Sequence, residues 1–202
     1  MWDEIVEQIC ATTGVAFRLA NARPVDGGCI NEAYRLDGDG GPFFAKLNRA
    51  DELSMFEAEA DGLRDIDATG TIRVPRPICH GVSGSRAYLV LEHIELGGGG
   101  SETELGRRLA KLHAAPRAHY GWRRDNTIGS TPQPNPEGDD WVAFLREHRL
   151  GFQCRLAKRN GLRLDDANKL LGQLDRFFTN YEPRPSLLHG DLWSGNVAFG
   201  PG

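Results

Sequence analysis

The sequence predicts an α+β fold, with a five-stranded antiparallel sheet and one inserted helix in its first half and a mainly helical second half. Two observations predict it. Between residues 17 and 95, short apolar runs are separated by glycines and prolines, as in strands joined by turns. Beyond the glycine-rich segment 97–101, apolar residues recur at helical spacing. We therefore expect two lobes, residues 1–95 and residues 96–202, with the glycine-rich segment as the hinge.

In the first lobe, apolar residues at helical spacing over residues 2–10 predict a short opening helix that stops at Gly14. Three antiparallel strands should follow between residues 17 and 48, because glycines at 27–28 and 38–41 mark turns. A helix should then start near Asp51, a good N-cap, and end at residues 69–70.

Two more strands complete the predicted sheet. Pro75 and Pro77 keep one segment extended, and the continuous apolar run 87–91 is typical of a buried strand.

In the second lobe we expect helices over 102–115, 141–159 and 165–181. Between the first two lies a proline-rich loop, residues 115–139. Loops of this length are uncommon inside a compact domain and are often functional, so Asn126 and Gln133 are candidate substrate-site residues.

Composition limits the partners. The 202 residues hold 24 Lys plus Arg against 28 Asp plus Glu, a net charge of −4 that argues against nucleic acid as the main partner. No apolar run approaches the ~18 residues that span a bilayer, and residues 1–4 are acidic where a secretory signal is basic, so we expect no membrane partner and a cytoplasmic location. The four cysteines lie far apart, which predicts neither a zinc site nor a disulfide scaffold.

The segment His189-Gly190-Asp191-Leu192-Trp193-Ser194-Gly195-Asn196 has the spacing of a kinase catalytic loop. Phosphoryl transfer to an alcohol needs a carboxylate beside the attacking hydroxyl and an oxygen ligand for magnesium. Asp191 would be the base and Asn196 the metal ligand. The alternative is a loop whose polar side chains satisfy only their own backbone.

Upstream residues fit the same chemistry. Lys46, in the third predicted strand, would bind ATP phosphates, and Glu59 on the next helix would orient it. Alone, the pair could equally be a solvated edge lysine and a surface glutamate; the order along the chain favours the kinase interpretation.

Gly27 and Gly28 would form a hairpin over the phosphates, although an ordinary turn has the same composition. After the buried strand, the Glu92 carbonyl and the Ile94 N–H would bind adenine. Cys29, in the glycine turn, is the best redox candidate among the cysteines, with an inert turn cysteine as the alternative. The chain would then be a monomer or a Cys29-linked homodimer.

These segments, together with 56–63 and 89–93, resemble the fructosamine kinase (ketosamine 3-kinase) family, which is related in fold to aminoglycoside phosphotransferases. Residues 126–129, 132–133, 140–141 and 146–150 also resemble the substrate lobe of that family. The resemblance runs from about residue 5 to 197. It implies a two-lobed, protein-kinase-like fold and ATP- and Mg²⁺-dependent phosphorylation of the sugar 3-hydroxyl of ketosamines, in protein deglycation and repair. Trp193 and the loop containing Asn126 and Gln133 would then contact the substrate.

One feature of that family is absent from the sequence, since no Asp follows Asp191. The family carries a second metal-binding Asp just after the catalytic loop, followed by more helices, so the second lobe is expected to be incomplete. Two alternatives therefore stay open: a related small-molecule kinase that acts on an aminoglycoside or choline, and a catalytically inactive nucleotide-binding module.

Overall fold

The computed structural model describes residues 1–25 and 30–200. Gly27, Gly28 and Cys29 therefore lie outside the described residues. Contacts divide the chain into two compact units: unit 1 comprises residues 1–113 and 188–202, and unit 2 comprises residues 114–187. These units are defined by contacts alone, and the lobe boundary expected after residue 95 stays a prediction. Within the described ranges, no helix combines the length and apolar character needed to cross a membrane.

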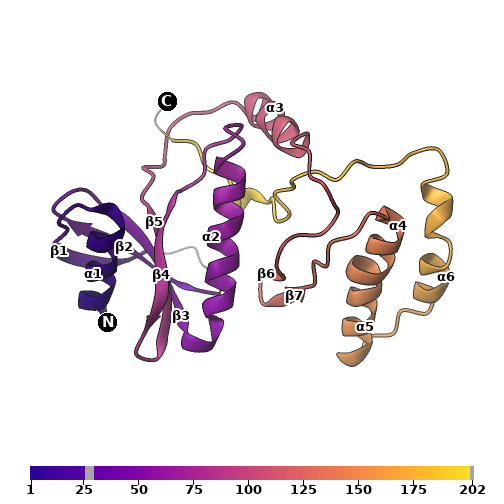
Figure 1. Ribbon diagram of the computed structural model, residues 1–202, viewed down its shortest axis with the longest axis horizontal. Helices are drawn as coiled ribbons and strands as arrows, with labels where there is room; N and C mark the ends of the chain where they lie inside the picture. The colour runs from indigo at the N-terminus through magenta and orange to yellow at the C-terminus, as the bar shows by residue number, and fades with distance from the viewer. Residues whose placement is uncertain (26–29, 201–202) are drawn as a thin grey trace. The chain divides into compact units, whose positions relative to one another are not determined.

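Unit 1 is built on a five-stranded antiparallel sheet of order β1-β2-β3-β5-β4. Its strands are β1 (Leu19–Val25), β2 (Glu32–Gly38), β3 (Phe43–Arg49), β4 (Pro77–Ser83) and β5 (Arg86–Glu92). The sheet confirms the predicted strands, because each lies between the glycines and prolines that mark the turns. It is drawn in indigo to magenta in Figure 1.

Helix α1 (Trp2–Thr13) packs on one face of the sheet. Ile5 and Ile9, one helical turn apart, are fully buried with Leu36 of β2 and Val90 of β5. Gly14 ends the helix in the left-handed conformation, with a φ of 69°, as the sequence predicts.

Helix α2 (Leu53–Asp67) covers the opposite face, because it packs on strand residues of the other parity. Phe56 and Ala60 are fully buried against Leu89 and Leu91 of β5. The predicted N-cap is wrong: a 3-10 turn, Ala50–Glu52, comes first, and Asp51 pairs with Arg49 instead of capping the helix. Helix α3 (Glu102–His113) completes this part of unit 1 and buries Leu112.

Unit 2 contains the predicted long loop, and within it a short hairpin of β6 (Asn126–Ile128) and β7 (Thr131–Gln133). The helix expected over 141–159 is continuous but changes pitch, passing from α4 (Trp141–Phe144) through a π-helical segment, Leu145–Leu150, to α5 (Gly151–Arg159). Asp140 caps it by accepting the Ala143 N–H at 2.9 Å.

The helix expected over 165–181 is wrong as a single element. The structure has α6 (Ala167–Leu171) and a separate 3-10 turn, Leu174–Phe177. Gly172 lies between them, and glycine is a poor residue for continuing a helix.

Candidate active site

The predicted lysine–glutamate pair forms in unit 1. Lys46 Nζ lies 2.5 Å from Glu59 Oε1, and the two side chains are 28% and 27% exposed. Lys46 points to the face that α2 covers, since Phe44, two residues earlier on β3, packs in the α2 core. Glu59 lies beside the buried Phe56 and Ala60 on the packed side of α2. A half-buried cation on the sheet is thus held by a carboxylate from the helix.

The end of the predicted phosphate hairpin is fixed to the same strand. Asn48 Nδ2, on β3, donates a hydrogen bond of 2.7 Å to Asn31 Oδ1, which directly precedes β2. The contact places Asn31 beside the strand that carries Lys46. The phosphate-binding roles of Gly27 and Gly28 stay predictions.

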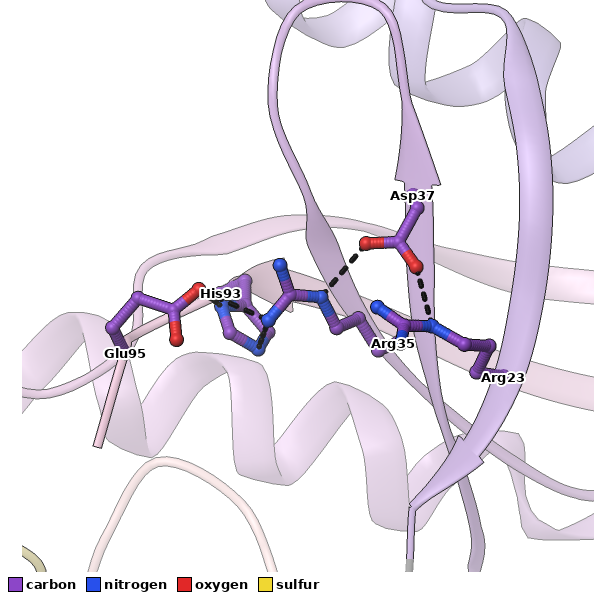
Figure 2. A network of polar contacts seen from close by, with 5 residues as sticks. All are labelled: Arg23, Arg35, Asp37, His93 and Glu95. Atoms are coloured by element: carbon purple, nitrogen blue, oxygen red, sulfur yellow. Dashed lines mark hydrogen bonds and ion pairs between the residues drawn. The ribbon is translucent and has the colours of Figure 1, made fainter. Parts of the chain in front are cut away.

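The predicted adenine segment follows β5. Glu92 ends the strand, its N–H donates to the Arg76 carbonyl at 2.8 Å, and its carboxylate pairs with Arg73 at 2.7 Å. Beyond Ile94, the side chain of Glu95 contacts Arg35 of β2, as Figure 2 shows. The segment is therefore held on both sides of Ile94.

In the predicted catalytic loop, the predicted base Asp191 and the predicted metal ligand Asn196 lie together. Asn196 Nδ2 donates to Asp191 Oδ2 at 3.0 Å and to the Asp191 carbonyl at 2.8 Å. A 3-10 turn, Ser194–Asn196, closes the loop, and the Asn196 N–H donates to the Trp193 carbonyl at 2.9 Å. Gly190 has a φ of 83°, a conformation that L-residues rarely adopt, so glycine is required between His189 and Asp191.

A second histidine supports the loop from α3. The His189 N–H donates to His113 Nε2 at 3.3 Å, and His113 is the last residue of α3. Burial is the main cause that lowers the pKa of His189. The negative charge of Asp191 acts in the opposite direction, and His113 makes a smaller contribution that lowers the pKa further. A neutral His189 ring places no positive charge beside the Asp191 carboxylate.

The oxygen atoms of Asp191 and Asn196 are of the kind that bind a hard cation such as Mg²⁺. The Asn196 amide donates through nitrogen, so its oxygen is the atom that could bind a metal, next to the Asp191 carboxylate. Among the residues that the structure describes, no group of three or more His, Cys, Asp or Glu side chains could hold a metal ion. Asn196, with the predicted base Asp191 beside it, would thus supply only part of a magnesium site, with phosphate and water oxygens as the usual remaining ligands.

In unit 2, the predicted substrate residues Asn126 and Gln133 bond to each other. Asn126 Oδ1 accepts from Gln133 Nε2 at 3.0 Å and from Asn135 Nδ2 at 2.8 Å. Asn135 is buried, at 3% exposure, and its amide oxygen accepts from Arg149 Nη2 at 2.6 Å. Desolvation by burial lowers the pKa of the Arg149 guanidinium, which also lies 4.5 Å from the centre of the Phe144 ring.

This network lies beside an open cavity of about 520 Å³ within unit 2. Residues 122–125 and 134–137 line it, together with His148 of the π-helical segment. Asn126 and Gln133 fix the hairpin next to the cavity, and neither lines it. Trp193, the third predicted substrate residue, belongs to unit 1, where it is 54% exposed.

Sequence reasoning missed four polar residues that organise these sites: Arg35, His113, Asn135 and Arg149. A signal existed for Arg149, because the segment 146–150 matches the substrate lobe of the family that the sequence resembles. Arg35 and His113 stand in ordinary strand and helix patterns, and only the fold brings them to their partners.

The fold defines the class. Unit 1 is a sheet with a paired lysine and glutamate and an Asp–Asn loop, and the chain is similar to crystal structures of protein-kinase-like phosphotransferases. One is a spectinomycin phosphotransferase, with a TM-score of 0.51 and 14% identity, which covers 98% of this chain and 65% of that one. At that identity the similarity shows the fold, and it confirms the predicted α+β, kinase-like architecture.

Comparison with known proteins then gives the family. A sequence profile of the family described as fructosamine kinase matches residues 1–201, and the chain belongs to this family of kinases. It is 48% identical over 201 residues to a protein of Synechocystis named as a probable ketoamine kinase, covering 98% of this chain and 68% of the relative. It is 40% identical over 206 residues to the chloroplastic protein-ribulosamine 3-kinase of Arabidopsis thaliana, covering 98% of this chain and 63% of that protein.

A solved structure supports the same family. The crystal structure of a Haemophilus somnus protein assigned as a fructosamine-3-kinase has a TM-score of 0.89 and 28% identity, over 99% of this chain and 69% of that one. The chain thus spans about two thirds of the length of these relatives.

Proposed function

We propose that the chain belongs to an ATP-dependent kinase that phosphorylates the sugar 3-hydroxyl of ketosamines, such as ribulosamine or fructosamine adducts of protein amines, in protein deglycation. One observation carries the proposal: the Asp191 carboxylate and the Asn196 amide meet in one turn, 3.0 Å apart, in a loop with kinase spacing. The names of the relatives support the choice of ketosamines as acceptor.

In the proposed reaction, Asp191 orients the sugar hydroxyl and accepts its proton. The hydroxyl oxygen forms a bond to the γ-phosphorus, the bond from that phosphorus to the β,γ-bridging oxygen breaks, and ADP leaves with that electron pair. Lys46, held by Glu59, binds phosphate oxygens of ATP, and the Glu92 carbonyl and the Ile94 N–H bind adenine. Asn196 would hold Mg²⁺, which would neutralise phosphate charge when bound.

The test is ADP formation that depends on a ketosamine. The full-length protein should form ADP with a ribulosamine or fructosamine substrate, and Asp191→Asn should lower kcat by at least about 100-fold because the isosteric amide cannot accept the proton. ATP binding should be nearly unchanged. Asp165→Asn, at an exposed residue of unit 2, is the matched control and should keep wild-type kcat.

Wild-type turnover by Asp191→Asn would refute the role of Asp191 as base. ADP formation with aminoglycoside or choline, and none with ketosamines, would support the related small-molecule kinase instead. ATP binding with no acceptor phosphorylated would support the inactive nucleotide-binding module.

A further inference from the structure

A single guanidinium connects the sheet of unit 1 to the segment that follows β5 (Figure 2). On β2, Arg35 Nε donates to Asp37 Oδ1 at 2.8 Å. At the other end of the same group, Arg35 Nη1 donates to Glu95 Oε1 at 2.9 Å and lies 3.4 Å from His93 Nε2. The two hydrogens of Nη1 can serve these two acceptors, so one side chain reaches both flanks of Ile94.

His93 Nε2 can accept a hydrogen from Arg35 Nη1. The other ring nitrogen, Nδ1, is buried without a hydrogen-bond partner in the described part of the chain and lies 3.6 Å from Glu95 Oε1. The His93 side chain is 13% exposed, so its position is set by the protein rather than by solvent.

Arg35 also lies on the face of the sheet that carries Lys46. Arg35 is directly opposite Phe44 in the β2–β3 register, and Lys46 is two residues further along β3. Side chains of residues i and i+2 share a face, and directly opposite residues do too. The face predicted to bind the phosphates of ATP is therefore continuous with the face from which Arg35 reaches the segment after β5.

We propose that Arg35 is a positioning residue of the nucleotide site, which fixes His93 and Glu95 so that the intervening Ile94 N–H is preorganised to bind the adenine base. The inference rests on the proposed function, since it takes ATP as the phosphate donor. It assigns to Arg35 a role in recognising the base rather than the phosphates.

The physical reason is preorganisation. A segment of three residues with both outer side chains anchored has few backbone conformations left at its centre, so less entropy is lost when the base binds. Hydrogen bonds between charged partners are shorter and stronger than neutral ones, and here one guanidinium contacts the side chains on both sides of Ile94. Without Arg35, Glu95, which is 63% exposed, would lose its bond to the sheet.

Arg23 provides a matched control. Its Nε donates to Asp37 Oδ2 at 2.7 Å, so Arg23 and Arg35 each bind one oxygen of the same carboxylate. Together they hold the pKa of Asp37 below its ordinary value, with Arg23 as the larger cause. Arg23 has the same charge and a shared partner, and Figure 2 shows it on the side of Asp37 away from His93 and Glu95.

The experiment measures ATP and tripolyphosphate dissociation constants by calorimetry for the full-length wild type, Arg35→Gln and Arg23→Gln. We expect Arg35→Gln to weaken ATP binding about tenfold, which corresponds to ~1.4 kcal/mol. Tripolyphosphate, which has no base, should bind as it does to wild type. Arg23→Gln should bind ATP within about twofold of wild type, with a change in melting temperature similar to that of Arg35→Gln.

Glu95 supplies the conservative comparison. Glu95→Gln keeps an oxygen that can accept from Arg35 and should retain most of the ATP affinity, whereas Glu95→Ala should behave like Arg35→Gln. The preference for ATP over GTP should decline in Arg35→Gln and in Glu95→Ala, and it should be unchanged in Arg23→Gln and Glu95→Gln.

Three outcomes would overturn the inference: equal loss of ATP affinity in Arg35→Gln and Arg23→Gln, equal loss for ATP and tripolyphosphate, or unchanged ATP affinity in Arg35→Gln. In each case the wild type still binds ATP and turns over ketosamine, so the proposed function stands. A wild type that does not bind ATP would overturn both.

Discussion

The side chains of Lys46 and Glu59 are both about one quarter exposed, so their pairing should act on phosphate binding more than on folding. Lys46→Ala and Glu59→Ala should each lower kcat/KM for ATP, by about tenfold or more, because the ammonium group offsets phosphate charge only when it is held in place. A double-mutant cycle should give a coupling of about 1 kcal/mol. Fully additive effects would show that Glu59 does not orient Lys46.

A histidine in unit 2 gives a pH-dependent prediction. His119 Nδ1 lies 2.5 Å from Asp139 Oδ1, and this hydrogen bond is the main cause that raises the pKa of His119 above its ordinary 6.5. A raised pKa means that the charged form stabilises the folded state. The stabilisation is complete below the pKa of the unfolded chain and is lost as the pH rises through the higher folded pKa.

Asp139→Asn should therefore lower the pKa of His119 and make the free energy of unfolding less dependent on pH above the ordinary pKa of 6.5. An NMR titration of the His119 ring checks the first effect, with Asp165→Asn as a control that leaves the ring unchanged. An unaltered titration curve in Asp139→Asn would contradict the pairing.

At the scale of the elements, the π-helical segment depends on Gly151. A Cβ at this position would lie 2.2 Å from the Arg146 carbonyl oxygen, five residues earlier, so any side chain forces the backbone to move. Gly151→Ala should destabilise the protein by about 1–3 kcal/mol. Gly106, inside α3, has nothing within 4 Å of the corresponding point, so Gly106→Ala should instead stabilise it by about 0.5–1 kcal/mol.

Urea unfolding of the two glycine variants measures both effects. Stability changes of the same sign in Gly151→Ala and Gly106→Ala would show that crowding at Arg146 does not control the π-helical segment.

The elements of unit 1 could be predicted from the sequence, and those of unit 2 only in part. Apolar periodicity and glycine turns located α1, α2 and all five strands, because each element buries one face. The β6–β7 hairpin was missed, since three-residue strands with Pro132 at the centre of one carry no alternating pattern. The pitch change at residues 145–150 has no signal in hydrophobic spacing.

At the scale of the whole molecule, the loop 189–196 could be predicted from the sequence, but the distant residues that hold the predicted site segments in place could not. Asp191 and Asn196 are five residues apart, and this spacing alone predicts that one loop carries both. Arg35 contacts partners 58 and 60 residues away, and the His189 N–H finds His113 at a separation of 76 residues. Such contacts follow from sheet register and chain topology, which a single sequence specifies only through the complete fold.

The order of the two units along the chain affects how the protein is made. Unit 1 is interrupted by unit 2, and the ends of that insertion are fastened by the Pro116–Ser186 bridge and by the Leu187 N–H, which donates to the Ala115 carbonyl at 3.0 Å. On the ribosome, the sheet with Lys46 and Glu59 is complete before unit 2 is synthesised, whereas Asp191 emerges only after it. A nascent chain should therefore acquire the lysine proposed to bind phosphates early and the carboxylate proposed as the base late, so that the proposed phosphoryl transfer cannot begin before unit 2 has been translated.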